Sequence, residues 1–129
     1  MAIQLDHTIV PSRTRDASAK RLASLLDVPC GAAKIGPFFA VYVNDGLTLD
    51  FIETSDDFPI SHFAFRVDET EFDQILGRIK AAGIAFRSNV RGPVDMRINT
   101  DYGGRMIYWN EPDGHQWEIL TVSYAREAQ

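Results

Sequence analysis

The strongest constraint on the fold is that the chain runs through one order of predicted elements twice. In each half, a strand is followed by an amphipathic helix and then by further strands, an order interpreted as βαβββ, of which three strands are evident in the first half and four in the second. The strand-like segments of the first half are residues 3–10, 38–44 and 47–54, and those of the second are 60–67, 84–88, 104–110 and 115–122. This repetition predicts one α+β domain over residues 1–129, built from one module at about 1–56 and a second at about 57–129.

The two predicted helices carry clear sequence signals. Residues 14–28 place leucines at helical spacing, with Ser12 or Thr14 as the cap and Pro29 as the stop. The second helix begins with a capping-box pattern at Asp68 and Glu71 and ends near Gly83. Asn44-Asp45-Gly46 predicts a tight turn between two strands of the first module.

Composition narrows the class of protein. The 129 residues are 45% hydrophobic and 24% charged, the values of an ordinary globular domain, and no apolar run is long enough to span a membrane. A net charge of −5 argues against nucleic-acid binding, and no phosphate-loop, dinucleotide or nucleophile-elbow motif is present. The absence of a signal-like N-terminus and the single cysteine, Cys30, predict a cytoplasmic protein without a disulfide or a cysteine-based zinc site.

Strand alternation directs three chemically active side chains away from the packing faces. His62 shares a face with Ala64 and Arg66, opposite Phe63 and Phe65. Glu118 lies opposite Trp117 and Ile119 in the last strand, and His7 occupies the place in the first module that His62 occupies in the second. Each residue alone is ordinary: a core histidine, or a glutamate on an edge strand. Together they predict a site of two histidines and one carboxylate, which suits a divalent metal with coordination positions left open.

Four segments carry a resemblance to a known family. They are LDHTIV at residues 5–10, SAKRLASLLDV at 18–28, the run at 61–84, and MIYWNEPDGHQWEIL at 106–120. The sequence resembles the vicinal oxygen chelate superfamily, which includes glyoxalases, bleomycin-resistance proteins, fosfomycin-resistance thiol transferases and extradiol dioxygenases. The resemblance implies two βαβββ modules that form a cup-shaped mixed sheet around a metal, with helices on the outer face. It also implies His7, His62 and Glu118 as ligands of Zn, Ni, Fe or Mn.

The resemblance extends to further residues of the site. Asp50 is the candidate for the fourth ligand that some members have, although glyoxalase-like members use a longer side chain there. Tyr108 stands where extradiol dioxygenases carry an acid–base tyrosine, and a core tyrosine is an equal alternative. Ile9 replaces the threonine of the fosfomycin transferases, and the additional histidine of the dioxygenases has no counterpart, since His115 is expected to be a solvated turn residue. Neither named reaction is therefore predicted.

The segment 87–105 is long, rich in turn-forming residues and contains four arginines. We expect residues 88–104 to border the site and to be more mobile than the strands. A solvated surface is the simpler explanation of the arginines, and an anion clamp is the functional one. The residues predicted to bind substrate are Arg66, Tyr42, Tyr102 and Arg105.

Two functions follow from these observations. The first is a metal-dependent lyase, isomerase or dioxygenase of the glyoxalase type, which acts on a small polar organic molecule by Lewis-acid stabilisation of negative charge. The alternative is a non-catalytic protein of the bleomycin-resistance type that sequesters a small molecule. The resemblance implies a homodimer in either case, and we expect no nucleic-acid or membrane partner.

Overall fold

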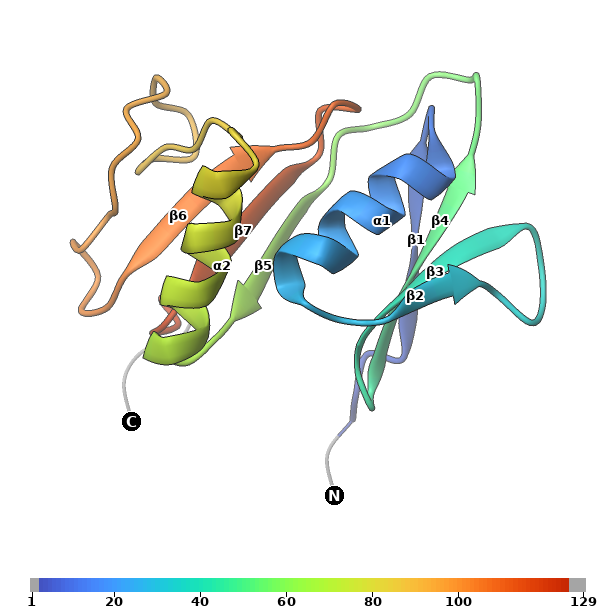
Figure 1. The fold of residues 1–129 in the computed structure, drawn as a ribbon, viewed down its shortest axis with the longest axis horizontal. Helices are drawn as coiled ribbons and strands as arrows, with labels where there is room; N and C mark the ends of the chain where they lie inside the picture. Colours follow the sequence, from blue (N-terminus) through green and yellow to red (C-terminus); the bar gives the residue numbers. More distant parts are fainter. Residues whose placement is uncertain (1–2, 126–129) are drawn as a thin grey trace. The chain divides into compact units, whose positions relative to one another are not determined.

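A computed structural model describes residues 3–125, which form two compact units. The first unit ends at Pro59 and the second begins at Ile60. Each contains one sheet and one helix, which confirms the α+β class (Figure 1). Neither helix in this part of the chain is long and apolar enough to cross a membrane.

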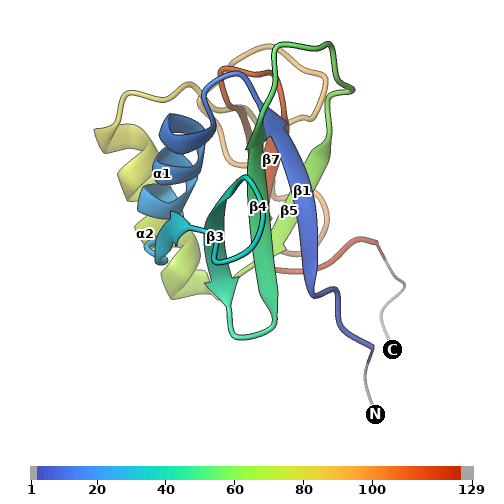
Figure 2. The same cartoon turned by 90° about the vertical axis from the view of Figure 1, so that its right-hand side faces the viewer.

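The first unit is a four-stranded sheet with one helix against it. Its elements are β1 (His7–Ser12), α1 (Arg15–Leu26), β2 (Cys30–Ala32), β3 (Phe38–Asn44) and β4 (Leu47–Glu53). The strands lie in the order β1-β4-β3-β2, and β1 runs parallel to β4 (Figure 2). The short strand β2 was not singled out from the sequence. Pro11 is accommodated because β1 is an edge strand, where a residue without an N–H breaks no ladder.

Burial in the first unit follows the alternation of its strands. Val10, Leu49 and Phe51 are almost completely buried on the face covered by α1. The helix contributes Ala19 and Leu22 to the same core. His7 and Ile9 lie on the opposite face and are exposed, so that face of the sheet is open within this unit.

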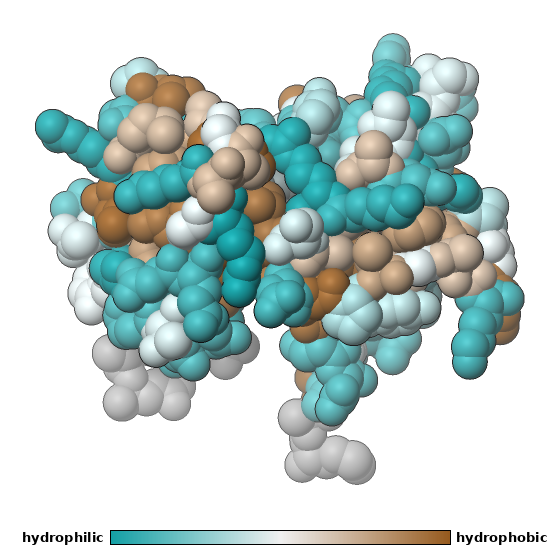
Figure 3. Space-filling model, viewed as in Figure 1, coloured by the Kyte–Doolittle hydropathy of each residue, from teal (hydrophilic) through white to brown (hydrophobic). Residues whose placement is uncertain are grey.

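The second unit is a three-stranded sheet with one helix. Its elements are β5 (His62–Arg66), α2 (Glu69–Ala81), β6 (Met106–Asn110) and β7 (Gln116–Leu120), and the strand order is β5-β7-β6. The capping box predicted for α2 is confirmed, because Asp68 accepts the N–H of Glu71 and Glu71 accepts that of Asp68. The exposed side of α2 is hydrophilic in the space-filling view (Figure 3). Its buried side consists of Phe72, Ile75, Leu76 and Ile79.

One predicted strand of the second module is reduced to a single bridge. Around residues 84–88 only Arg87 pairs with the sheet, through two 2.9 Å hydrogen bonds with the backbone of Tyr108. The chain leaves the ladder immediately afterwards because the N–H of Ser88 bonds to the side chain of Asp95 instead of to a strand. The prediction of a short strand here was therefore wrong, although Arg87 within it does pair.

Candidate functional site

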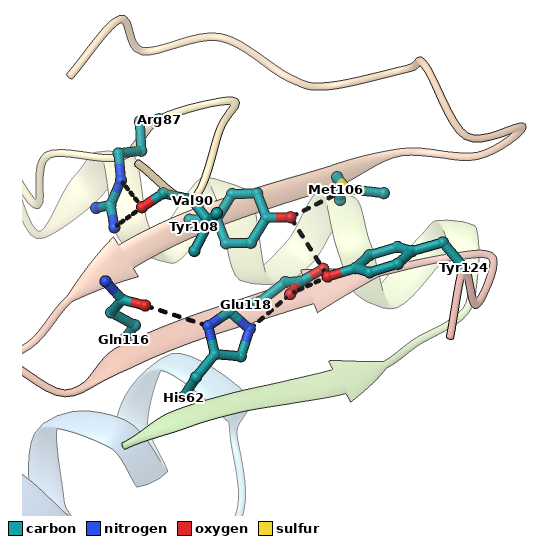
Figure 4. Close-up of polar contacts among 8 residues, drawn as sticks. All are labelled: His62, Arg87, Val90, Met106, Tyr108, Gln116, Glu118 and Tyr124. Carbon is teal, nitrogen blue, oxygen red and sulfur yellow. Dashed lines mark hydrogen bonds and ion pairs between the residues drawn. The ribbon is translucent and has the colours of Figure 1, made fainter. Parts of the chain in front are cut away.

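The register of the second sheet brings the predicted residues of this unit onto one face. Across the strands, Ala64 pairs with Glu118, Glu118 with Tyr108, and Tyr108 with Arg87. Residues that are paired directly across neighbouring strands point to the same side of a sheet. His62 is two residues before Ala64 on the same strand and therefore shares this side. Figure 4 shows His62, Tyr108 and Glu118 together in front of the strands.

The centre of this group is a direct contact between His62 and Glu118. Nε2 of His62 lies 2.9 Å from Oε1 of Glu118, although the two residues are far apart in the sequence. The His62 side chain is 37% exposed, whereas the Glu118 side chain is completely buried. The site therefore has a carboxylate at its floor and an imidazole that reaches toward solvent.

Glu118 has one oxygen without a hydrogen-bond partner. Oε1 accepts bonds from His62 and from the hydroxyl of Tyr124, each at 2.9 Å. Oε2 is fully buried and has no partner among the described residues. A buried carboxylate oxygen without a partner is costly, and a bound cation is one of the few arrangements that offsets the cost.

Gln116 orients the imidazole of His62. The two residues are directly paired across β5 and β7, and Oε1 of Gln116 lies 3.2 Å from Nδ1 of His62. With Nδ1 donating to this amide oxygen, Nε2 is the nitrogen turned toward Glu118. Histidines that bind metals commonly donate their other N–H to an oxygen in this manner.

The phenols of Tyr108 and Tyr124 meet beside Glu118. Their hydroxyl oxygens are 3.4 Å apart, and the Tyr108 hydroxyl also lies 3.4 Å from the sulfur of Met106. Burial is the main cause that raises the pKa of Tyr108 above its ordinary value, and the charge of Glu118 adds to the effect. Burial of the Tyr124 hydroxyl and its bonds to Tyr108 and Glu118 raise the pKa of Tyr124 as well. Both groups are thus neutral phenols at physiological pH and can donate hydrogen bonds.

In the first unit, the predicted residues lie on the open face of the sheet. His7 pairs with Thr48, which pairs with Tyr42, so that Tyr42 stands in the same row as His7, two strands away. Asp50 pairs with Ile9 in the next row and shares this face. The structure brings His7, Asp50 and Tyr42 onto one surface without direct contact among their side chains in the described interactions.

His7 is oriented by its neighbour. Its Nδ1 lies 2.8 Å from Oδ2 of Asp6, and this hydrogen bond is the main cause that raises the pKa of His7 above its ordinary value. The charge of Asp50 raises the pKa in the same direction. The bond to Asp6 engages Nδ1 and leaves Nε2 as the nitrogen that can bind a metal. In both His7 and His62, a side-chain oxygen therefore holds Nδ1 and orients the ring.

The remaining predicted residues have different placements. Arg66 is exposed and lies on the face of His62, at the far end of β5. Tyr102 is 57% exposed and its ring lies 5.4 Å from that of Tyr124, at the border of the site. The structure does not bring Arg105 to this group, because its guanidinium bonds to Glu69 and Asp73 of α2.

Three contributors were not found from the sequence. Tyr124 lies beyond the last predicted strand, and alternation along that strand places Gln116 on the face of Glu118 without assigning it a role. His115 was expected to be a solvated turn residue, but it is completely buried and its Nδ1 accepts the N–H of Ser61 at 3.0 Å. This bond joins the turn before β7 to the start of β5, and the expectation was wrong because a turn position does not reveal what packs against it.

The geometry can be tested for a metal with the residues of one unit. Among residues 3–125, no three His, Cys, Asp or Glu side chains lie close enough together to hold an ion. The second unit supplies a pair, His62 and Glu118, with a nitrogen and an oxygen directed at each other and the buried Oε2 unsatisfied. This pair fits two positions of a metal site of two histidines and one carboxylate.

Two solved structures match this chain over nearly its whole length. No family model matches the sequence. The chain is similar to the solved structures of oxidase ChaP-H2 and oxidase ChaP-H1. For ChaP-H2 the identity is 37%, the TM-score 0.89, and the match covers 99% of this chain and 100% of that one. For ChaP-H1 the identity is 42%, the TM-score 0.88, and the coverage 97% and 100%.

A third similarity is to the fosfomycin resistance protein FosX of Mesorhizobium japonicum. It is 32% identical over 73 residues, which are 54% of this chain and 48% of that protein, so the match spans about half of its length. Fosfomycin-resistance proteins are among the proteins that the sequence resembles. The chain belongs to the vicinal oxygen chelate superfamily. Membership of the vicinal oxygen chelate superfamily establishes the fold and leaves the reaction to be argued from the site.

Proposed function

We propose that this protein is a divalent-metal-dependent enzyme of the glyoxalase/dioxygenase group that acts on a small polar organic molecule. The observation that carries the proposal is the buried Glu118 carboxylate, whose Oε2 has no partner among the described residues while Oε1 is held by His62. A cation at Oε2 would remove the cost of the unsatisfied oxygen. Nε2 of His62 lies beside it and is a nitrogen ligand that Zn, Ni, Fe and Mn accept.

In this proposal His7 is the third ligand, supplied by the same chain or by a second copy in a homodimer. Support comes from the orientation of its ring, because Asp6 holds Nδ1 of His7 as Gln116 holds Nδ1 of His62, and Nε2 is left for a metal. Asp50 is the candidate for a fourth ligand or for a partner of metal-bound water. It shares the open face with His7 and influences its pKa electrostatically.

A bound metal would act as a Lewis acid toward oxygen atoms of the substrate. The protein's own groups then have separate tasks. Tyr108, which its surroundings keep neutral, donates a hydrogen bond or a proton to a developing oxyanion. Arg66 and Tyr102 border this face and are the proposed contacts for the polar and apolar parts of the substrate, and Tyr42 is the proposed contact on the face of His7, two strands away from it.

Among the reactions open to such a site, an oxidation is favoured. Both relatives that match nearly the whole chain bear the name oxidase, and they are more than 35% identical to it. The FosX match covers only part of each protein, and the threonine expected for fosfomycin transferases is replaced by Ile9. We therefore place an oxidase or dioxygenase reaction ahead of group transfer, with lyase and isomerase reactions after it.

The experiment has two stages. Protein purified without added metal is analysed for bound metal, and the affinities for Mn, Fe, Ni and Zn are then measured by titration calorimetry. We expect one site per chain in the wild type and a large loss of affinity in Glu118→Gln. Glu111→Gln is the matched control, because Glu111 is also a buried glutamate of the same unit, close to β7.

A screen of candidate substrates with and without oxygen follows on the loaded protein. Oxygen consumption that requires both metal and Glu118 supports the oxidase reaction. Wild-type protein that binds none of the four ions would contradict the metal-dependent enzyme and leave sequestration of a small molecule as the function. Light scattering tests the proposed homodimer.

A further inference from the structure

Tyr124 reaches back to the carboxylate from outside the sheet. It belongs to the segment that follows β7, and its hydroxyl donates a 2.9 Å hydrogen bond to Oε1 of Glu118 (Figure 4). The residue remains 44% exposed, and its ring lies against the ring of Tyr102. Tyr124 is thus half exposed while its hydroxyl points inward, and the hydrogen bond to Glu118 accounts for this orientation.

The backbone that carries Tyr124 is tied to the sheet. Thr121 exchanges two bonds with Arg105, one from each N–H, at 2.9 and 3.0 Å. A Cβ added at Gly104 would lie 2.6 Å from Oγ1 of Thr121 and 2.7 Å from Cγ2 of Val122. A residue without a side chain at position 104 therefore allows this close approach. The backbone of Thr121 and Val122 is held against the sheet by contacts that do not involve Tyr124.

The hydroxyl of Tyr124 selects one oxygen of Glu118. A phenol has a single proton, and in Tyr124 that proton is directed at Oε1 of Glu118. Oε1 is thereby occupied from the protein side. Oε2 is the oxygen that remains without a partner in the described structure.

We propose that Tyr124 is a positioning residue that holds Oε1 of Glu118, so that the carboxylate presents Oε2 alone to a divalent metal. The inference rests on the proposed metal site. Carboxylates that bind metals are commonly oriented by a hydrogen bond from a neighbouring group, and Tyr124 would supply that bond to Glu118. Without the hydroxyl, the carboxylate can rotate and offer both oxygens, which changes the number of bonds to the metal and loosens the site.

Tyr124→Phe tests the inference, because it removes the hydroxyl and keeps the ring. The loss of such a partner lowers metal affinity by about 10- to 100-fold. Tyr102→Phe is the matched control: it removes the hydroxyl of the adjacent exposed tyrosine, which makes no bond to Glu118 in the described structure. Titration of the metal-free proteins with Co²⁺ measures the affinity, and the visible absorption of bound Co²⁺ reports the coordination number.

We expect Tyr124→Phe to bind Co²⁺ more weakly, with an absorption spectrum altered in intensity, while Tyr102→Phe matches the wild type in both. Urea unfolding of the metal-free variants checks that the fold is intact. Wild-type affinity and an unchanged spectrum in Tyr124→Phe would overturn the positioning role and leave the metal site itself standing. Absence of Co²⁺ binding in the wild type would instead overturn the proposed function, and this inference with it.

Discussion

Replacing Glu118 by glutamine separates the cost of a buried charge from the benefit of a bound metal. The amide keeps the size of the side chain and can still accept bonds from His62 and Tyr124. Each bond to a neutral acceptor is weaker by about 1 kcal/mol than the bond to a carboxylate, so the two together lose about 2 kcal/mol. Removal of a completely buried charge offsets a loss of this size. Without metal, the variant should therefore lie within about 2 kcal/mol of the wild type.

A bound metal should make the wild type clearly more stable than Glu118→Gln. A metal at about 1,000 times its dissociation constant stabilises the wild type by about 4 kcal/mol, and a variant that has lost the ligand gains much less. Urea unfolding in EDTA and again in the presence of the metal measures both differences, with Glu111→Gln expected to gain the full metal-dependent increment. An equal gain in Glu118→Gln would refute Glu118 as a ligand. A loss well above 2 kcal/mol in EDTA would show that the carboxylate serves the fold rather than a metal.

Three further predictions follow from other contacts. Gly104→Ala should displace the segment after β7 and weaken metal binding without altering any ligand, as titration calorimetry would reveal; unchanged affinity would contradict the fixed path of that segment. Hydrogen bonds to Asp95, chiefly from Ser88, hold its pKa below the ordinary 3.8, so the stabilisation is present above that value and is lost as the pH falls through the lowered pKa. Ser88→Ala should raise this pKa, as NMR titration of the carboxyl would measure, and an unchanged value would count against the bond. Trp117→Ala should lower the free energy of unfolding by about 3–5 kcal/mol, because the indole is buried and stacked on two phenylalanines, and a loss below 1 kcal/mol in denaturant unfolding would contradict that packing.

The pairing of His62 with Glu118 could be predicted because it depends only on local rules. Alternation along β5 and β7 fixes which side chains share a face of the sheet. The aromatic residues that alternate with His62 and Glu118 identify the opposite face as the one that packs in the core. Tyr108 follows from the same rule, since the turn after β6 sets its register opposite Glu118. The Asn44-Asp45-Gly46 turn was predictable for a similar reason, because its residue types suit a tight connection.

The remainder depends on contacts that no local pattern contains. Tyr124 follows the last strand, and its place depends on the close packing of Thr121 and Val122 against Gly104, which only the folded structure reveals. His115 is buried because the start of β5 lies against its turn. Arg105 was predicted to bind substrate from its neighbourhood in the sequence, yet two carboxylates one helical turn apart on α2 hold it. Long side chains near a site find the nearest opposite charge, and its position is a tertiary property.

The metal site proposed for His7, His62 and Glu118 binds one divalent ion. Its most direct test is anomalous X-ray diffraction from crystals grown with zinc, recorded on both sides of the zinc absorption edge. We expect one anomalous peak per site, about 2.0–2.2 Å from Nε2 of His62, from Oε2 of Glu118 and from a nitrogen of His7 of the same chain or of a second copy. A peak bound elsewhere, or no peak with Glu118 paired to an arginine, would contradict the claim.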